Sequence, residues 1–227
     1  LCGSGQRLGK HPHRTDFPND MAAYKALIQR AASRCHKAGI AVLCNSEVDP
    51  GLWDCADGQM YECMWYCPGW KGREKGWIQM RYAGELWAQA ASRGATVQLL
   101  HYLSVEAPHR RLQAAIFTRA WCLLYGLMWS DWYNLADDKN SALRAAARRL
   151  YSLNLGPALN PKPLLLGPCL ARRFKYGLVA LNQTRLRQQI SVPWAAGPLR
   201  DIATGALAKP SGACGYVAQR ALSLIHI

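Results

Sequence analysis

Residues 56–66, ADGQMYECMWY, carry the main fold signal, because they place one carboxylate, Glu62, at the end of a short apolar run that is typical of a strand. Residues 39–47, GIAVLCNSE, repeat this arrangement just upstream, where an apolar run ends in Asn45 and Glu47. The chemistry of barrel enzymes takes place where parallel strands end. Two successive apolar runs with polar ends therefore predict an enzyme active site.

The sequence around these two runs continues as an alternation of helices and strands. Apolar residues at helical spacing predict helices over residues 20–37, 78–93, 109–126 and 137–151, and apolar runs predict strands over 41–45, 58–64, 96–104 and 127–134. Such an alternation favours βα units around a parallel sheet. About four units are expected, which is half of an eight-unit barrel.

The character of the chain changes beyond Leu153. Residues 154–168 are rich in proline and glycine, and the runs that follow are short and separated by glycine or proline. This pattern predicts a small all-β module with a hairpin that turns at Tyr176 and Gly177. We therefore expect an α/β fold: the C-terminal part of a TIM (β/α)8 barrel over residues 1–153, followed by a sandwich-like β domain over 154–221.

Both ends of the chain carry further expectations. The sequence begins with Leu1, and no strand precedes the first predicted helix, so the N-terminal barrel units are expected to lie upstream. Residues 222–227, LSLIHI, match one translated frame of a transposon end that is used in sequencing libraries. We interpret them as adapter read-through. The alternative is a final apolar strand.

The composition predicts a folded protein without a membrane span. Half of the 227 residues are hydrophobic, and Arg119 interrupts the best membrane candidate, residues 114–128. The net charge of +14 comes largely from arginines that are scattered rather than gathered in one tract. No nucleic-acid-binding motif accompanies this charge, so we interpret it as a solvated surface and predict no nucleic-acid partner. Localisation and oligomeric state stay open.

The nine cysteines include no C-x-x-C pair. Cys63 and Cys67 are closest in sequence, but their spacing, with His36 or the pair His11 and His13 as further ligands, matches no usual zinc site. Cys44 and Cys122 fall within predicted elements and are expected to be small core residues. The sequence therefore predicts neither a metal nor a cofactor.

Several short motifs together resemble a family of TIM-barrel glycoside hydrolases, the hypothetical glycosyl hydrolases, which carry a C-terminal β domain. In this family a strand that ends in asparagine precedes a strand of the form D-G-x-x-x-E, here Asp57, Gly58 and Glu62. The matching positions after the barrel are Gly167, Pro168, Arg173, Phe174, Gly177, Val179, Asn182 and Thr184. The resemblance spans most of residues 20–220 and implies a fold and a reaction class without naming a substrate. The reaction class makes a carbohydrate the predicted partner.

The resemblance also assigns Glu62 to catalysis. Glycoside hydrolases need one carboxyl group to protonate the leaving oxygen and a second to act as nucleophile or to activate water. The apolar neighbours of Glu62 favour the acid role, because desolvation raises the pKa of a carboxyl group. The alternative is a strand-end glutamate paired with an arginine. The family also implies an aspartate on an earlier strand, which would lie upstream of Leu1.

Other residues are weaker candidates. Asp131 and Glu47 are possible second carboxylates, and Asn45 is expected either to bind a sugar hydroxyl or to cap a loop. Asp57 is expected to be a structural turn residue. Aromatic rings can pack against a pyranose face, and each one here is either such a platform or part of the core. These aromatic candidates are Trp65, Tyr66, Trp129 and Trp132. The alternative function is a carbohydrate-binding barrel protein without turnover.

Overall fold

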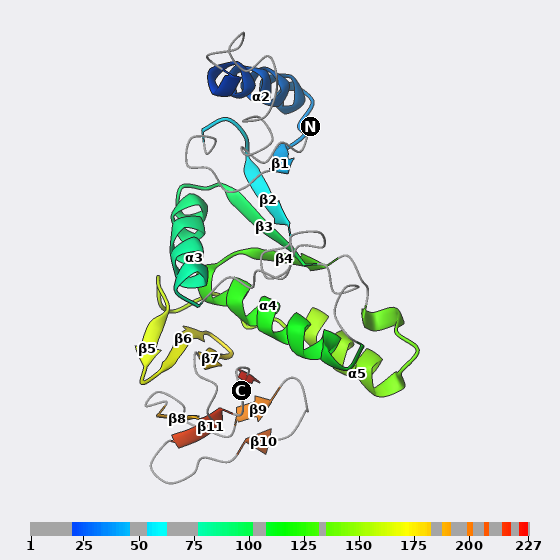
Figure 1. Cartoon of the computed structure of the whole chain (residues 1–227), viewed down its shortest axis with the longest axis vertical. Helices are drawn as coiled ribbons and strands as arrows, with labels where there is room; N and C mark the ends of the chain where they lie inside the picture. Colours follow the sequence, from blue (N-terminus) through cyan, green and yellow to red (C-terminus); the bar gives the residue numbers. More distant parts are fainter. Residues whose placement is uncertain are drawn as a thin grey trace. The chain divides into compact units, whose positions relative to one another are not determined.

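The computed structural model describes residues 20–45, 54–62, 77–101, 108–131 and 135–182, together with short strands nearer the carboxyl terminus (Figure 1). The chain divides into two compact units, Leu1–Leu100 and His101–Ile227. The predicted domain boundary at residues 154–168 lies inside the second unit. The division into compact units does not test where one folding domain ends and the next begins. The boundary at residues 154–168 therefore stays a prediction.

The first unit follows the predicted order of elements closely. Helix α2 ends before Gly39, whose φ of 71° is easily reached only by glycine, as expected for a helix stop. Strand β3 begins in this unit and reaches the first residue of the second. In chain order the elements are α2 (Asp20–Lys37), β1 (Leu43–Asn45), β2 (Gly58–Glu62), α3 (Trp77–Ser92) and β3 (Thr96–His101).

The strands form a parallel sheet, as the sequence predicts. Leu43 pairs with Gly58, and Gly58 pairs with Thr96 on its other side. Strand β4 (Met128–Asp131) completes the sheet in the order β1-β2-β3-β4. Strands that are consecutive in the chain are therefore neighbours in space, which is also the strand order of a barrel. The mixed α/β fold is confirmed, whereas the assignment of these strands to the C-terminal part of a (β/α)8 barrel stays a prediction.

Asp57 connects the start of this sheet to α2. Its Oδ2 atom accepts a hydrogen bond from the Val42 N–H at 2.7 Å and lies 2.8 Å from His36 Nε2. Its carbonyl oxygen accepts a hydrogen bond from the Thr96 N–H at 2.8 Å. The Val42 N–H, and after it the His36 ring, holds the pKa of the Asp57 carboxyl below its usual value. These contacts confirm that Asp57 is a structural turn residue.

The second unit continues with helices and then antiparallel strands. Helix α4 ends at Gly126, which adopts φ 75° and donates its N–H to the Cys122 carbonyl oxygen. In chain order the elements are η4 (Pro108–Arg110), α4 (Arg111–Tyr125), β4, η5 (Leu135–Asp137), α5 (Ser141–Tyr151), β5 (Leu164–Leu166), β6 (Cys169–Phe174), β7 (Gly177–Asn182), β8 (Gln188–Ser191), β9 (Leu199–Asp201), β10 (Leu207–Ala208), β11 (Gly215–Ala218) and β12 (Ser223–His226).

Helix α5 begins four residues later than the sequence analysis expects. The Asn140 side-chain oxygen accepts hydrogen bonds from the Ala142 N–H at 3.0 Å and the Leu143 N–H at 3.1 Å. These two bonds satisfy amide groups that have no partner inside the helix, so Asn140 is the N-cap. Residues Leu135–Asp137 form a separate 3-10 turn instead. The prediction of one helix over residues 137–151 is therefore wrong at its start.

The antiparallel character of the C-terminal region is confirmed. One sheet has the order β10-β9-β12-β7-β6-β5, and β8 pairs with β11 in a separate ribbon. Strands β6 and β7 form the predicted hairpin, but Gly177 already pairs with Phe174, so the turn residues are Lys175 and Tyr176. The turn was therefore predicted one residue too late. A sandwich of two packed sheets stays a prediction.

The segment interpreted as adapter read-through contains a strand. Residues Ser223–His226 form β12, in which Leu224 pairs with Val179 of β7. β12 lies between β9 and β7 in the sheet, and a short apolar segment can pair with exposed strands whatever its origin, because the backbone supplies the hydrogen bonds. The pairing agrees with a final strand and does not test the adapter interpretation.

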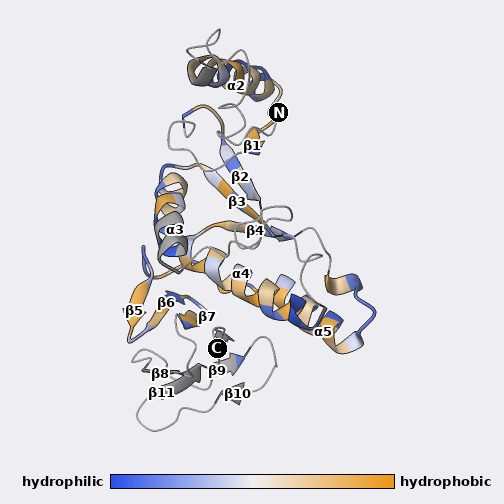
Figure 2. Cartoon of the chain, in the orientation of Figure 1, coloured by the Kyte–Doolittle hydropathy of each residue, from blue (hydrophilic) through white to orange (hydrophobic). Residues whose placement is uncertain are grey.

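The core of the second unit lies where α4 meets β6 and β7. Trp121 and Leu124 of α4 are fully buried, as are Val179 and Leu181 of β7. Figure 2 shows hydrophobic and hydrophilic residues alternating along α4, as expected for a helix with one apolar face. The helix therefore packs its apolar face against the antiparallel sheet.

Arg172 joins the same two elements by hydrogen bonds. Its Nη1 atom donates to the carbonyl oxygens of Leu123 at 3.1 Å and Leu124 at 2.9 Å, in the last turn of α4. Its Nε atom donates to the backbone carbonyl oxygen of Asn160 at 3.1 Å, and its Nη2 atom donates to that of Pro161 at 3.4 Å. A helix leaves its last carbonyl groups without intrahelical partners, and Arg172 supplies donors for two of them.

We expect Arg172→Met to destabilise the chain by about 2 kcal/mol, because it keeps an apolar stem and leaves partly buried carbonyl groups without a donor. Arg148→Met is the matched control, since it removes the same charge from an exposed position on α5. Urea unfolding followed by circular dichroism measures both variants. Equal losses in the two variants would show that charge, rather than these hydrogen bonds, is responsible.

Candidate functional site

The parallel strands end in polar residues, as predicted for β1, β2 and β4. Asn45 is the last residue of β1, Glu62 of β2, His101 of β3 and Asp131 of β4. The carboxyl ends of parallel strands are where binding and catalytic groups gather in α/β folds. Asn45, Glu62 and Asp131 are thus the last described residues of their strands, and their placement at a functional strand end stays a prediction, as do their roles.

The strand registers place Glu62 along the sheet. Its Cα pairs with Leu100 of β3, and Asn45 pairs with Met60, two residues before Glu62. Tyr61 is buried and packs its ring against Trp87 of α3, with 4.7 Å between the ring centroids. Because successive positions of a strand alternate between the two faces, position 62 is in the opposite phase from this helix-facing tyrosine.

His101 is a strand-end residue that the sequence analysis did not select as a site residue. Its side chain is 1% exposed, and Nδ1 lies 3.0 Å from the Thr118 hydroxyl of α4. The Thr118 hydroxyl donates its hydrogen to the Ala114 carbonyl oxygen at 2.9 Å. The Thr118 oxygen therefore accepts from Nδ1–H, which assigns the neutral Nδ1–H tautomer to His101. A histidine inside an apolar run is the signal that could have drawn attention to it.

Burial sets the protonation state of His101. Desolvation lowers its pKa from 6.5 to about 4, since the charged ring would lose its hydration. A neutral imidazole bonded to a helix threonine connects β3 with α4. We therefore interpret His101 as a structural residue at this strand end.

Asp131 lies in a small cluster of polar and aromatic side chains. The Tyr151 hydroxyl, at the end of α5, donates to Asp131 Oδ2 at 2.9 Å and accepts from the Leu135 N–H at 3.2 Å. The Tyr151 ring stacks on Trp129 with 5.3 Å between centroids, and the Arg119 guanidinium lies 5.7 Å from the Trp129 ring centre. The pKa of Tyr151 is raised, first by burial and then by the Asp131 charge.

These contacts change the interpretation of Trp129. Both of its neighbours lie over the π system of the ring, which is the surface that would pack against a sugar. Trp129 therefore packs against Tyr151 and Arg119 in this structure, and its role as a sugar platform stays a prediction. Asn45, in contrast, has an exposed side chain.

The other predicted site residues fall outside the described residues. The Glu62 backbone belongs to β2, but its side chain is not among those described. Glu47 precedes the described segment 54–62, and Trp65 and Tyr66 follow it. Trp132 follows β4. The roles predicted for them stay predictions.

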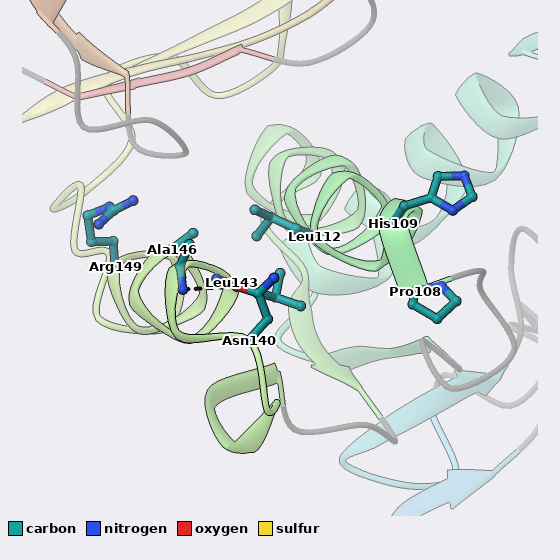
Figure 3. Close-up of a pocket in the computed structure, with 8 residues that line it drawn as sticks. Pro108, His109, Leu112, Asn140, Leu143, Ala146 and Arg149 are labelled. Carbon is teal, nitrogen blue, oxygen red and sulfur yellow. Dashed lines mark hydrogen bonds between the residues drawn. The ribbon is translucent and has the colours of Figure 1, made fainter.

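A groove of about 410 Å³ lies between the amino-terminal ends of α4 and α5 (Figure 3). Pro108, Leu112 and Leu143 are among its apolar lining residues, and His109 and Arg149 are its basic ones. Of the predicted site residues whose side chains the structure describes, none lines this groove.

The described residues give no sign of a metal site or of a membrane-spanning helix. Within the described part of the chain, no group of three or more His, Cys, Asp or Glu side chains is arranged to hold a metal ion. The described helices include none with the length and apolar character to cross a membrane.

No model of a known protein family matches the chain, and no curated protein is similar enough to count as a relative. The resemblance to glycosyl hydrolases therefore rests on the quoted motifs alone.

Proposed function

We propose that this chain forms part of a glycoside hydrolase that acts at the carboxyl ends of its parallel strands. The observation that supports the proposal is the parallel sheet of consecutive strands, in which β1, β2 and β4 end in Asn45, Glu62 and Asp131. Polar groups at strand ends are the usual placement of chemistry on parallel barrels. Two of the motifs that resemble the glycosyl hydrolases, the strand-end asparagine and D-G-x-x-x-E, fall on β1 and β2.

In this proposal Glu62 is the general acid. Cleavage of a glycosidic bond passes through an oxocarbenium-like transition state, and the leaving oxygen needs a proton as the bond breaks. A glutamate among apolar neighbours keeps its proton to higher pH, because its charged form is poorly solvated. Position 62 also lies in the strand phase opposite to Tyr61, which faces α3. Position 62 therefore belongs to the face of β2 opposite to the one that packs against α3.

The second carboxylate is assigned to Asp131, with Glu47 as the other candidate in the chain. It would act as nucleophile in a retaining enzyme or as general base in an inverting one. Asn45 would bind a sugar hydroxyl, and Trp65, Tyr66 and Trp132 are the remaining aromatic candidates for packing on a pyranose ring. The substrate class is an oligosaccharide or polysaccharide with O-glycosidic bonds.

The test is the leaving-group dependence of turnover in Glu62→Gln. With alkyl or sugar leaving groups, we expect kcat/KM to fall by about 10²- to 10⁴-fold, the usual contribution of a general acid. With dinitrophenyl glycosides the loss should be much smaller, because this leaving group departs without a proton. A panel of glycosides assayed on the full chain, and on any longer product of its reading frame, measures both.

Glu85→Gln is the matched control, since it removes a glutamate from the exposed surface of α3, where it pairs with Arg81 at 3.5 Å. Unchanged turnover in Glu62→Gln, for every leaving group, would remove Glu62 from the mechanism. Carbohydrate binding without turnover in the unsubstituted protein would instead support the non-catalytic carbohydrate-binding barrel.

A further inference from the structure

The Asp131 carboxylate receives a hydrogen bond whose direction is fixed by its surroundings. The Tyr151 oxygen lies 2.9 Å from Asp131 Oδ2 and 3.2 Å from the Leu135 backbone nitrogen. The Leu135 N–H can only donate, so it occupies a lone pair of the phenol oxygen. The phenol hydrogen is therefore directed to Asp131, and the carboxylate accepts it.

Packing holds the Tyr151 ring in place for this bond. The ring is inclined by 28° to that of Trp129, at a centroid distance of 5.3 Å. Trp129 lies two residues before Asp131 on β4, and therefore in the same strand phase. Leu150, the residue before Tyr151, is 1% exposed and anchors the end of α5 in the core. The hydroxyl is thus positioned by β4 and α5 together.

The charges nearby favour a phenol that keeps its proton. Partial desolvation raises the pKa of Tyr151, which is still 36% exposed, and the negative charges of Asp131 and of Asp137 on η5 raise it further. Arg119 of α4 contributes a cation to this cluster, and its guanidinium lies over the Trp129 ring. The Tyr151 hydroxyl is therefore a hydrogen-bond donor, and not a base, at the end of β4.

We propose that Tyr151 is a positioning residue that orients Asp131, in its ionised form, as the second carboxylate of the glycosidase site. The inference rests on the proposed function and deepens it, because it prefers Asp131 to Glu47. A donor to a carboxylate stabilises the charged form, which is the form that attacks as nucleophile or accepts a proton as base. Tyr151 itself need not touch the substrate.

The test uses Tyr151→Phe, which keeps the ring and its stacking and removes only the hydroxyl. In a carbon NMR titration of the full chain, we expect the Asp131 carboxyl to take up its proton at higher pH in Tyr151→Phe than in the unsubstituted chain. In Asp131→Asn, the Tyr151 ring should lose its proton at lower pH. Tyr176→Phe, at the exposed turn of the β6–β7 hairpin, is the control and should move neither titration.

A second readout separates this inference from the proposed function. For any glycoside that the protein turns over, kcat/KM is measured as a function of pH. In Tyr151→Phe its acid limb should move to higher pH, together with the Asp131 titration. An unchanged Asp131 titration in Tyr151→Phe would overturn the inference, as would full turnover in Asp131→Asn. If the Asp131 titration shifts in Tyr151→Phe but the unsubstituted protein turns over no glycoside, the orientation of Asp131 by Tyr151 stands. The glycosidase function is then overturned.

Discussion

Gly58→Ala is expected to destabilise the first unit by more than about 3 kcal/mol, because the added methyl group overlaps a neighbouring strand. A Cβ atom at position 58 would meet the Thr96 carbonyl oxygen, and it would lie 2.8 Å from the Thr96 Cβ and 2.9 Å from the Thr96 carbonyl carbon. Gly58 also pairs with Leu43 on its other side. Backbone atoms of a paired strand cannot rotate away, so relief requires the strands to separate.

Gly94→Ala is the matched control for this prediction. Gly94 has φ 89°, but a Cβ atom there would meet nothing within 4 Å. Its cost should be limited to backbone strain, about 1 kcal/mol. Urea unfolding followed by circular dichroism and tryptophan fluorescence compares the two variants. Equal costs would contradict the interpretation that β2 and β3 approach too closely for a side chain at position 58.

The second large effect is a loss of stability in mild acid that depends on His101. The pKa of this histidine is about 4 in the folded chain, below its ordinary value of 6.5, because the ring is buried. Between these two pH values the unfolded chain binds a proton that the folded chain does not. The contribution of His101 to the free energy of unfolding is therefore fully present above pH 6.5. It is lost as the pH falls toward 4, and the total loss is ~3 kcal/mol.

His101→Gln isolates this contribution, because an amide can still donate to the Thr118 hydroxyl and does not titrate in this range. The variant should be less stable than the unsubstituted chain at pH 7 and should lack part of the slope of unfolding free energy between pH 6.5 and 4. Carboxyl groups such as Asp57 contribute in both proteins and cancel in the difference. Parallel slopes for the two proteins would contradict a buried neutral His101.

The order of elements in the described part of the chain was predictable because it depends on local patterns. Residues 20–37 place their apolar side chains at helical spacing, and α2 has these bounds. The apolar runs before Asn45 and Glu62 became strands that end at these residues. Where prediction was wrong, as at the start of α5, one capping side chain, Asn140, overrode the periodicity of the helix.

The contacts around the candidate site were not predictable in the same way. Tyr151 contacts Asp131 across 20 residues, and His101 meets Thr118 across 17. Arg172 reaches Leu124 across 48 residues. Tyr151 reads in the sequence as the last residue of an amphipathic helix, and nothing in that pattern indicates its partner. Such pairs arise only when the packing of two elements brings their side chains together.

The sequence by itself therefore determined the elements, the parallel sheet and the polar residues at its strand ends, because hydrophobic periodicity and turn residues act over a few positions. Only the tertiary structure decided what surrounds those residues. It made His101 a neutral core residue, placed Trp129 beneath Tyr151 and gave Asp131 a phenol donor. Burial and hydrogen bonding set the chemistry of a side chain, and both depend on distant parts of the chain folding against each other.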